Sequence, residues 1–308
     1  AEPGYCRIIS SCSPYVQPPP PSTFYDVLEE WGCHWMWDTL QLDGEMEFLA
    51  EAIADKSLMI ATDGSFMVEL NPELCSAAFF FECTKGRGKL VGSFPDATCT
   101  ACAYRGELLG LLAVHLILLA VNKTRPQLRG SVHIYSDCLG ALNSVVDIPV
   151  NRIPSGTPHS DILKTLMIQC SDFTFRRQFS HVSAHKLDHM AWAKLSRPEQ
   201  LNESCDYAAK REIYEFDSGK LVPQRSFPLE PITMFVDNEK MTSDTGDHLR
   251  FHAHRILAKE FFTTAQSKKS LPLLSAEAFE AIDWPNVYYV LHHVPCLFQL
   301  FACKQVTG

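Results

Sequence analysis

The 308-residue sequence lacks an excess of positive charge, since it has 27 Lys and Arg against 36 Asp and Glu and a formal net charge of −9. Electrostatic nucleic-acid binders usually carry a basic excess, so the chain as a whole is not a binder of that kind. The deficit is uneven: residues 1–56 hold 2 basic and 10 acidic residues, whereas residues 57–214 hold 16 and 15. The central part is close to neutral, so charge excludes a strongly basic domain and little else.

Long hydrophobic runs are also missing. The longest covers residues 108–121 and contains Gly110 and His115. A membrane-spanning helix needs about 20 apolar residues, so this run predicts a buried helix and no membrane contact. A basic-then-apolar signal pattern is absent as well. Because the chain begins at Ala1, we expect it to be part of a longer polypeptide.

The 12 cysteines do not form the dense framework of a short secreted module, because they are scattered along the whole chain. We therefore expect reduced, mostly buried thiols in an intracellular protein, either cytoplasmic or nuclear. Hydrophobic residues make up 46% of the chain, which is enough for a packed core.

Three regions differ in pattern. Residues 1–56 predict a linker with a proline-rich run, Gln17 to Pro21, followed by a helical flank. Residues 57–214 form the main domain. Residues 215–308 predict a mostly helical C-terminal extension, with helices around 248–264 and 276–281.

The main domain shows an alternation of element types. Strands are expected at 58–61, 75–81, 89–94, 131–136 and 173–182, and helices at 100–121, 139–146, 160–170 and 201–214. Three adjacent strands followed by strand–helix alternation predict an α/β fold with a mixed five-stranded sheet flanked by helices.

Four acidic residues occupy positions where ligands bind in such folds. Asp63 and Asp137 come where strands end, Glu107 lies in the first turns of the long helix, and Asp206 lies in the last helix. Four converging carboxylates would repel one another, and hard divalent cations such as Mg²⁺ relieve that repulsion. Two such ions can activate a water and stabilise the leaving oxygen in phosphodiester cleavage.

The segments around these acids resemble the four motifs of the ribonuclease H family, in the family's order and on the elements that the family uses. They are Thr62-Asp63-Gly64-Ser65, Tyr104-Arg105-Gly106-Glu107-Leu108, Tyr135-Ser136-Asp137 and Asn202-Glu203-Ser204-Cys205-Asp206. The run from His181 to Asp188 is similar, more narrowly, to the ribonuclease H domain of retrotransposon reverse transcriptases. The resemblance covers about residues 57–214.

The resemblance implies a ribonuclease H-like fold and an endonuclease that cuts the RNA strand of RNA–DNA hybrids. It implies that Asp63, Glu107, Asp137 and Asp206 are catalytic and bind two Mg²⁺ ions, with Mn²⁺ as a possible substitute. It also implies that His185, in the loop before the last helix, assists proton transfer or product release. A reverse transcriptase polymerase domain in the same polyprotein is the implied partner, with residues 1–56 as the end of a connection region.

The hybrid substrate implies further contacts, because its 2′-hydroxyls line a wide minor groove. We expect Gly64, Ser65 and Asn143 to contact these groups, and Arg105 to contact a phosphate. Further phosphate candidates are Lys123, Arg125, Arg176, Arg177 and Lys194.

Two other interpretations stay open. One is a catalytically decayed, nucleic-acid-binding or structural module of the same origin, which the four intact acids disfavour. The other is a different nuclease or transposase on the same fold. Exonuclease relatives have Asp-x-Glu where this chain has Asp63-Gly64-Ser65, and integrase-like relatives end in Glu where this chain has Asp206.

Overall fold

The computed structural model describes residues 23–146, 153–154, 156–169, 173–184, 186–216, 225–236 and 239–243, residue 246, a few residues between 256 and 263, and residues 275–282. The chain divides into two compact units. The first comprises residues 1–153 and 161–233, and the second comprises residues 154–160 and 234–308. Each unit is described below by itself, for the described residues only.

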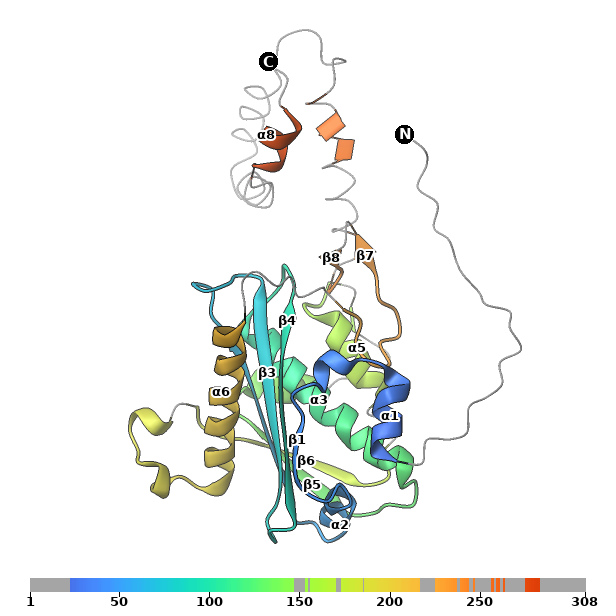
Figure 1. The fold of residues 1–308 in the computed structure, drawn as a ribbon, viewed down its shortest axis with the longest axis vertical. Coiled ribbons are helices and arrows are strands. Elements are labelled where there is room, and N and C mark those ends of the chain that lie inside the picture. The colour runs from blue at the N-terminus through green and yellow to red at the C-terminus, as the bar shows by residue number, and fades with distance from the viewer. Residues whose placement is uncertain are drawn as a thin grey trace, which may run out of the picture. The chain divides into compact units, whose positions relative to one another are not determined.

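The first unit is built on a mixed sheet with the strand order β1-β4-β3-β2-β5-β6 (Figure 1). The strands β2, β3 and β4 form an antiparallel meander, whereas β5 runs parallel to β2 and to β6. The bounds are β1 (Gln41–Gly44), β2 (Leu58–Phe66), β3 (Leu74–Cys83), β4 (Gly88–Ala97), β5 (Ser131–Ser136) and β6 (Arg176–His181). The mixed sheet and its five predicted strands are confirmed.

The sixth strand, β1, corrects the prediction of a five-stranded sheet. It pairs antiparallel with β4, from Gln41 opposite Val91 to Gly44 opposite Gly88. Its four residues contain one apolar side chain, Leu42, so they lack the alternation that marks a half-buried strand. Backbone pairing to β4 makes this segment a strand, and the sequence carries no local signal for it.

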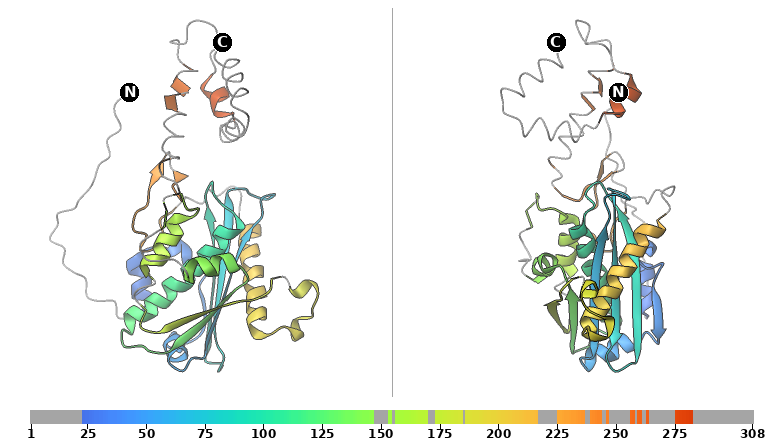
Figure 2. Two further views of the ribbon diagram at one scale, coloured as in Figure 1. Left: turned by 180° about the vertical axis from the view of Figure 1, so that it is seen from behind. Right: turned by 90° about the vertical axis from the view of Figure 1, so that its left-hand side faces the viewer.

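Helices cover both faces of this sheet. In Figures 1 and 2, α6 lies alone on one face, and α1, α3 and α5 lie on the other. The bounds are α1 (Phe24–Trp31), α2 (Phe48–Ala54), α3 (Ala103–Thr124), α4 (Leu139–Val146), α5 (Ser160–Gln169) and α6 (Arg197–Glu215), with short 3-10 helices at His34–Met36, Lys186–Asp188 and Trp192–Lys194. The four predicted helices of the main domain are therefore confirmed.

Helix α6 starts four residues earlier than we predicted from the hydrophobic pattern. Ser196 caps it, and the Ser196 and Glu199 side chains form a capping box. Pro198 lies in the first turn, where a missing backbone N–H costs no hydrogen bond. The true start is therefore marked by capping residues, which lie ahead of the first apolar position, Leu201.

Helix α3 is the buried centre of the unit. By length and composition it could cross a membrane, but 94% of its most apolar stretch is buried inside the fold. Even His115 is buried, and its ring Nδ1 lies 2.7 Å from the Leu111 carbonyl oxygen. The prediction of a buried helix over residues 108–121 is confirmed.

The hydrophobic core extends beyond the predicted 57–214 domain. Phe24 and Val27 of α1, Leu49 of α2 and Phe227, which follows α6 along the chain, belong to one cluster with the apolar face of α3. The flank and the first part of the extension are thus built into the same core.

The second unit contains short elements. β7 (Phe235–Val236) pairs antiparallel with β8 (Glu239–Lys240), and α8 covers Ala276–Glu280 with Ser275 as its N-cap. The helix predicted at 276–281 is confirmed. Most of the helix predicted at 248–264 lies outside the described residues.

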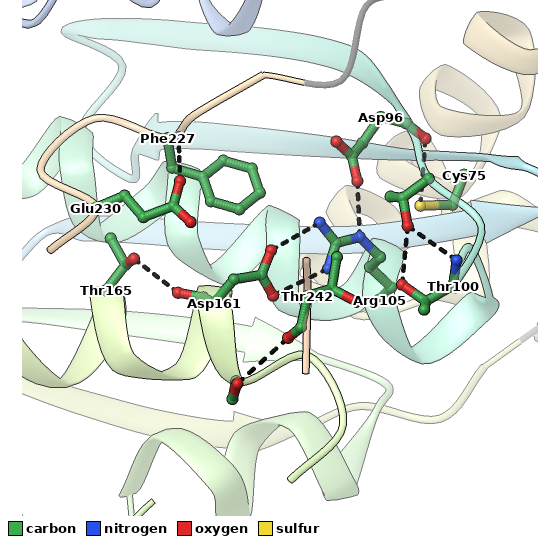
Figure 3. Close-up of polar contacts among 11 residues, drawn as sticks. Cys75, Asp96, Thr100, Arg105, Asp161, Thr165, Phe227, Glu230 and Thr242 are labelled. Carbon is green, nitrogen blue, oxygen red and sulfur yellow. Dashed lines mark hydrogen bonds and ion pairs between the residues drawn. The ribbon is translucent and has the colours of Figure 1, made fainter. Parts of the chain in front are cut away.

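A buried ion triad joins three elements of the first unit (Figure 3). Arg105 of α3 donates from Nε to Asp96 of β4 at 2.7 Å and from its two terminal nitrogens to Asp161 of α5 at 3.2 and 3.1 Å. The Arg105 side chain is 0% exposed. The prediction that Arg105 contacts a substrate phosphate is therefore wrong, because two protein carboxylates enclose its guanidinium away from solvent.

Replacement of Arg105 by Met should destabilise the fold by about 3–5 kcal/mol, because it leaves Asp96 and Asp161 as buried carboxylates without a cation. Urea unfolding monitored by circular dichroism measures this loss. Adding Asp96→Asn and Asp161→Asn to the same variant should restore part of it.

The matched control is Arg211→Met on the exposed side of α6, which should change stability by less than about 0.5 kcal/mol. Equal losses for Arg105→Met and Arg211→Met would contradict a structural role for the triad.

Candidate metal centre

Asp63 and Asp137 are brought together by the parallel pair β2 and β5. The pairing runs from Leu58 opposite Val132 to Ala61 opposite Tyr135. Each acid follows two residues later, and side chains two residues apart share a face of the sheet. Both carboxylates therefore lie on the same face of the sheet, with Asp137 directly after β5 and Asp63 within β2, just beyond the stretch that pairs with β5.

Glu107 reaches this point because α3 packs directly on the backbone of β2. A Cβ atom on Gly64 would lie 2.3 Å from the backbone nitrogen of Glu107, and one on Gly106 would lie 2.7 Å from the Ser76 carbonyl oxygen. Both contacts are too short for any side chain. Glycine at both positions lets the helix approach closely enough to set Glu107 beside the end of β2.

Two hydrogen bonds orient the Glu107 carboxylate. The Gly64 backbone N–H donates to Oε1 at 3.1 Å, and the Ser136 hydroxyl donates to Oε2 at 3.4 Å. The first bond uses the Gly64 amide that we predicted to contact substrate, and Ser65 is buried. The Gly64 amide thus serves Glu107 and helix packing, whereas the predicted substrate contact of Ser65 stays a prediction. Asn143 is exposed on α4, and its predicted contact stays a prediction.

The three acids form one cluster. Carboxylate oxygens of Asp63, Glu107 and Asp137 all lie within 4.8 Å of one another. Asp63 is 4% exposed and Glu107 is 7% exposed, whereas Asp137 is partly exposed. Such a group presents only hard oxygen donors, which Mg²⁺ and Mn²⁺ prefer.

The electrostatics of the cluster favour a cation. Burial raises the pKa of Asp63 far above its usual range, and the neighbouring carboxylate of Glu107 raises it further. Burial likewise raises the pKa of Glu107, and the charge of Asp137 adds to that effect. Ionising all three carboxylates is therefore unfavourable in the protein alone, and a divalent cation would remove the penalty. The donor set fits such an ion.

Asp206 does not belong to the cluster. Its carboxylate pairs with Lys210 one turn further along α6, at 2.7 Å. It still lies near enough for its charge to raise the pKa of Asp63. Three acids therefore converge, Asp206 lies nearby in a pair with a lysine, and its role as a fourth metal ligand stays a prediction.

Asn202 is a residue of α6 whose side chain contacts the acidic cluster. Its Nδ2 donates to Asp63 at 3.4 Å and to Asp137 at 3.3 Å, and its side chain is 3% exposed. Its Oδ1 is buried and has no hydrogen-bond partner among the described residues. Sequence reasoning missed this role. The signal was available, since Asn202 precedes Asp206 by one helical turn and faces the same way.

The predicted catalytic residue His185 lies outside the described residues. In the same stretch, His181 ends β6, and its ring Nε2 lies 2.9 Å from the Asp137 carbonyl oxygen. This contact ties the end of β6 to the backbone of Asp137.

No family model matches the chain, and no curated protein matches it. Solved structures do. The crystal structure of LC11-RNase H1 in complex with an RNA/DNA hybrid is 12% identical, covers 51% of this chain and 97% of its own, and gives a TM-score of 0.38. The solution structure of the prototype foamy virus RNase H domain is 16% identical, with coverages of 51% and 94% and a TM-score of 0.39. An N-terminal RNase H domain from Mycobacterium tuberculosis is 15% identical, with coverages of 51% and 93% and a TM-score of 0.32.

The class of fold follows from the strands themselves. A mixed sheet whose antiparallel meander β4-β3-β2 continues into parallel β5 and β6, with helices on both faces, is the ribonuclease H-like architecture that the motifs implied. The first unit therefore has a ribonuclease H-like fold, extended by β1 and α1.

Asp63→Asn should stabilise the metal-free protein by about 1–3 kcal/mol at pH 7. The raised pKa of Asp63 means that folding loses stability as pH rises above about 4, where the unfolded carboxyl ionises. The gain from the amide should therefore vanish below about pH 4. Thermal unfolding in chelator from pH 4 to pH 8 measures it.

Mg²⁺ or Mn²⁺ should raise the unfolding temperature of the wild type and of an Asp43→Asn control on exposed β1, and should leave Asp63→Asn unchanged. The same metal-induced rise in Asp63→Asn as in the wild type would refute metal binding by this cluster.

Asn202→Asp should place a further negative charge against Asp63 and Asp137. We expect a loss of about 2–3 kcal/mol in chelator, and a larger metal-induced stabilisation than in the wild type. Asn143→Asp, the same substitution at an exposed site, should do neither. If metal fails to recover the stability of Asn202→Asp, Asn202 does not face the ion site.

Proposed function

We propose that this chain is a metal-dependent endonuclease that cleaves the RNA strand of RNA–DNA hybrids. The observation that carries the proposal is the convergence of three carboxylates, two of them buried, within 4.8 Å beside the carboxyl end of β5. The ribonuclease H-like fold supports it, and one similar structure is described as a complex with an RNA/DNA hybrid.

The cluster suits phosphodiester hydrolysis. Asp63, Glu107 and Asp137 would hold the ions, and two Mg²⁺ would supply an activated water and a stabilised leaving oxygen. The chain's own contribution is to hold the carboxylates in place. Ser136 and the Gly64 amide fix Glu107, and Asn202 bridges the two aspartates.

Two predicted catalytic residues remain part of the proposal. Asp206 is the fourth acid, and release from Lys210 would let its carboxylate turn toward the site. His185 is proposed to move a proton or to assist product release, since a histidine near its reference pKa changes charge near neutral pH.

The wider setting is also proposed. We infer that the chain is the nuclease part of a retroelement polyprotein and works in the cytoplasm or nucleus beside a reverse transcriptase polymerase domain. Helices α1 and α2 pack into the nuclease core. This packing supports a flank that holds the nuclease at a fixed position relative to the polymerase domain.

The test uses the full chain with labelled RNA–DNA hybrid, duplex RNA and duplex DNA, in Mg²⁺ or Mn²⁺. We expect cleavage of the RNA strand of the hybrid alone. Asp137→Asn should lower the rate by at least about 100-fold, since charge stabilisation by metal contributes several kcal/mol. Asp43→Asn is the control and should cleave as the wild type does.

Each other outcome selects a different function. Binding of the hybrid without cleavage would favour a catalytically decayed module. Cleavage of duplex DNA would favour another nuclease or a transposase on the same fold. Cleavage that Asp137→Asn leaves intact would overturn the site.

A further inference from the structure

One face of the sheet continues from the acidic cluster to the opposite end of β5. Val132 and Ile134 point into the core with α3, whereas Ala61 of β2 packs against α6. Side chains alternate along a strand, so His133 and Tyr135 lie on the face of α6, as do Asp63 and Asp137. The partners of these residues on β6 are Gln178 and Ser180.

Helix α6 leaves the β5 and β6 part of this face largely uncovered. Helix α6 lies against β2 and β3 and makes few contacts with β5. His133 and Tyr135 stack at 4.4 Å between ring centroids, and both are partly exposed. Gln178 beside them is exposed. A hollow of about 730 Å³ opens at the starting ends of β5 and β6, and its lining includes His133, Gln178 and the cations described next.

Three cations from separate segments meet at this hollow: Lys56 after α2, Arg129 before β5 and Arg176 at the start of β6. All three are exposed, and no ion pair is found for them among the described residues. Gly130 brings the segments together. A Cβ atom there would lie 1.9 Å from the Ile53 carbonyl oxygen, and its own carbonyl accepts from the Arg176 N–H at 3.0 Å.

Lys56 is held at the hollow by the end of α2. Its φ is 62°, in the left-handed region that glycine and asparagine adopt more readily. This conformation closes α2, since the Lys56 N–H donates to the Ile53 carbonyl oxygen at 3.2 Å and the Ser57 N–H donates to the Ala52 carbonyl oxygen at 2.8 Å. Neither the core nor an ion pair with a described residue accounts for a cation at this position.

We propose that this hollow binds the phosphate backbone of the hybrid at a distance from the cut. The inference rests on the proposed function. The six residues of β5 rise about 3.3 Å each, so the three cations lie roughly 20 Å from the acidic cluster, at the opposite end of β5. At about 3.4 Å per base pair, that is about six base pairs along the duplex. The chain has a net charge of −9, so its overall charge does not favour binding to a phosphate backbone. A local group of cations without ion pairs to described residues supplies that attraction.

The test compares two hybrids with the same central ribonucleotides, flanked on each side by about 3 or about 12 base pairs, so that only the longer one spans 20 Å. The test variant combines Lys56→Asn, Arg129→Gln and Arg176→Gln. Binding is measured by fluorescence anisotropy in Ca²⁺ over a range of salt, and cleavage in Mg²⁺. The variant should bind the longer hybrid at least about 10-fold more weakly, with a salt slope smaller by about 2–3.

The variant should bind and cleave the shorter hybrid as the wild type does. Lys89→Gln, Lys164→Gln and Arg211→Gln together form the control, since they remove equal charge from β4, α5 and α6 and none of them lines the hollow. Lys56→Asn alone should raise the unfolding temperature, because asparagine tolerates its backbone conformation. That measurement shows that the fold is intact.

Unchanged binding and salt slope for the longer hybrid would overturn this inference while leaving the proposed function standing. Equal weakening for both hybrids, or for the control variant, would also overturn it. A wild type that cleaves neither hybrid would instead overturn the proposed function, and this inference with it.

Discussion

The close approach of α3 to β2 is the contact on which the rest of the first unit depends. Gly64 and Gly106 meet backbone to backbone, with no room for a Cβ atom on either. This contact sets Glu107 beside Asp63 and lets the Gly64 N–H hold the Glu107 carboxylate. It also buries the apolar length of α3, which contributes more residues to the core cluster than any other element. The same packing that stabilises the fold therefore positions the candidate site.

Arg105 and Glu107 lie two residues apart on α3, and each belongs to a buried group of charged side chains. The two groups differ in their charge balance. Arg105 is neutralised inside the protein by Asp96 and Asp161, so it ties β4, α3 and α5 together. Glu107 faces Asp63 and Asp137, and Asn202 supplies two hydrogen bonds but no positive charge. The first group is complete without a ligand and is structural. The second has an excess of negative charge, which is the physical reason to assign it a cation.

The local patterns predicted most of the fold. Five strands and four helices of the main domain follow from hydrophobic period and turn residues, because the core imposes those patterns on each element. Strand β1 could not be predicted, since pairing with β4 makes it a strand and its own side chains do not. The start of α6 was placed late, because capping by Ser196 depends on polar residues ahead of the apolar face.

The sequence by itself determined which residue types are available for chemistry: acids at strand ends, in motifs that resemble ribonuclease H, at positions that alternation places on one face. Only the tertiary structure decided how each is used. It paired Asp206 with Lys210, enclosed Arg105 between two carboxylates and brought Asn202 to the aspartates. It also gathered Lys56, Arg129 and Arg176 around one hollow. Apart from the Asp206–Lys210 pair within α6, these outcomes depend on contacts between residues far apart in the chain, which local periodicity does not predict.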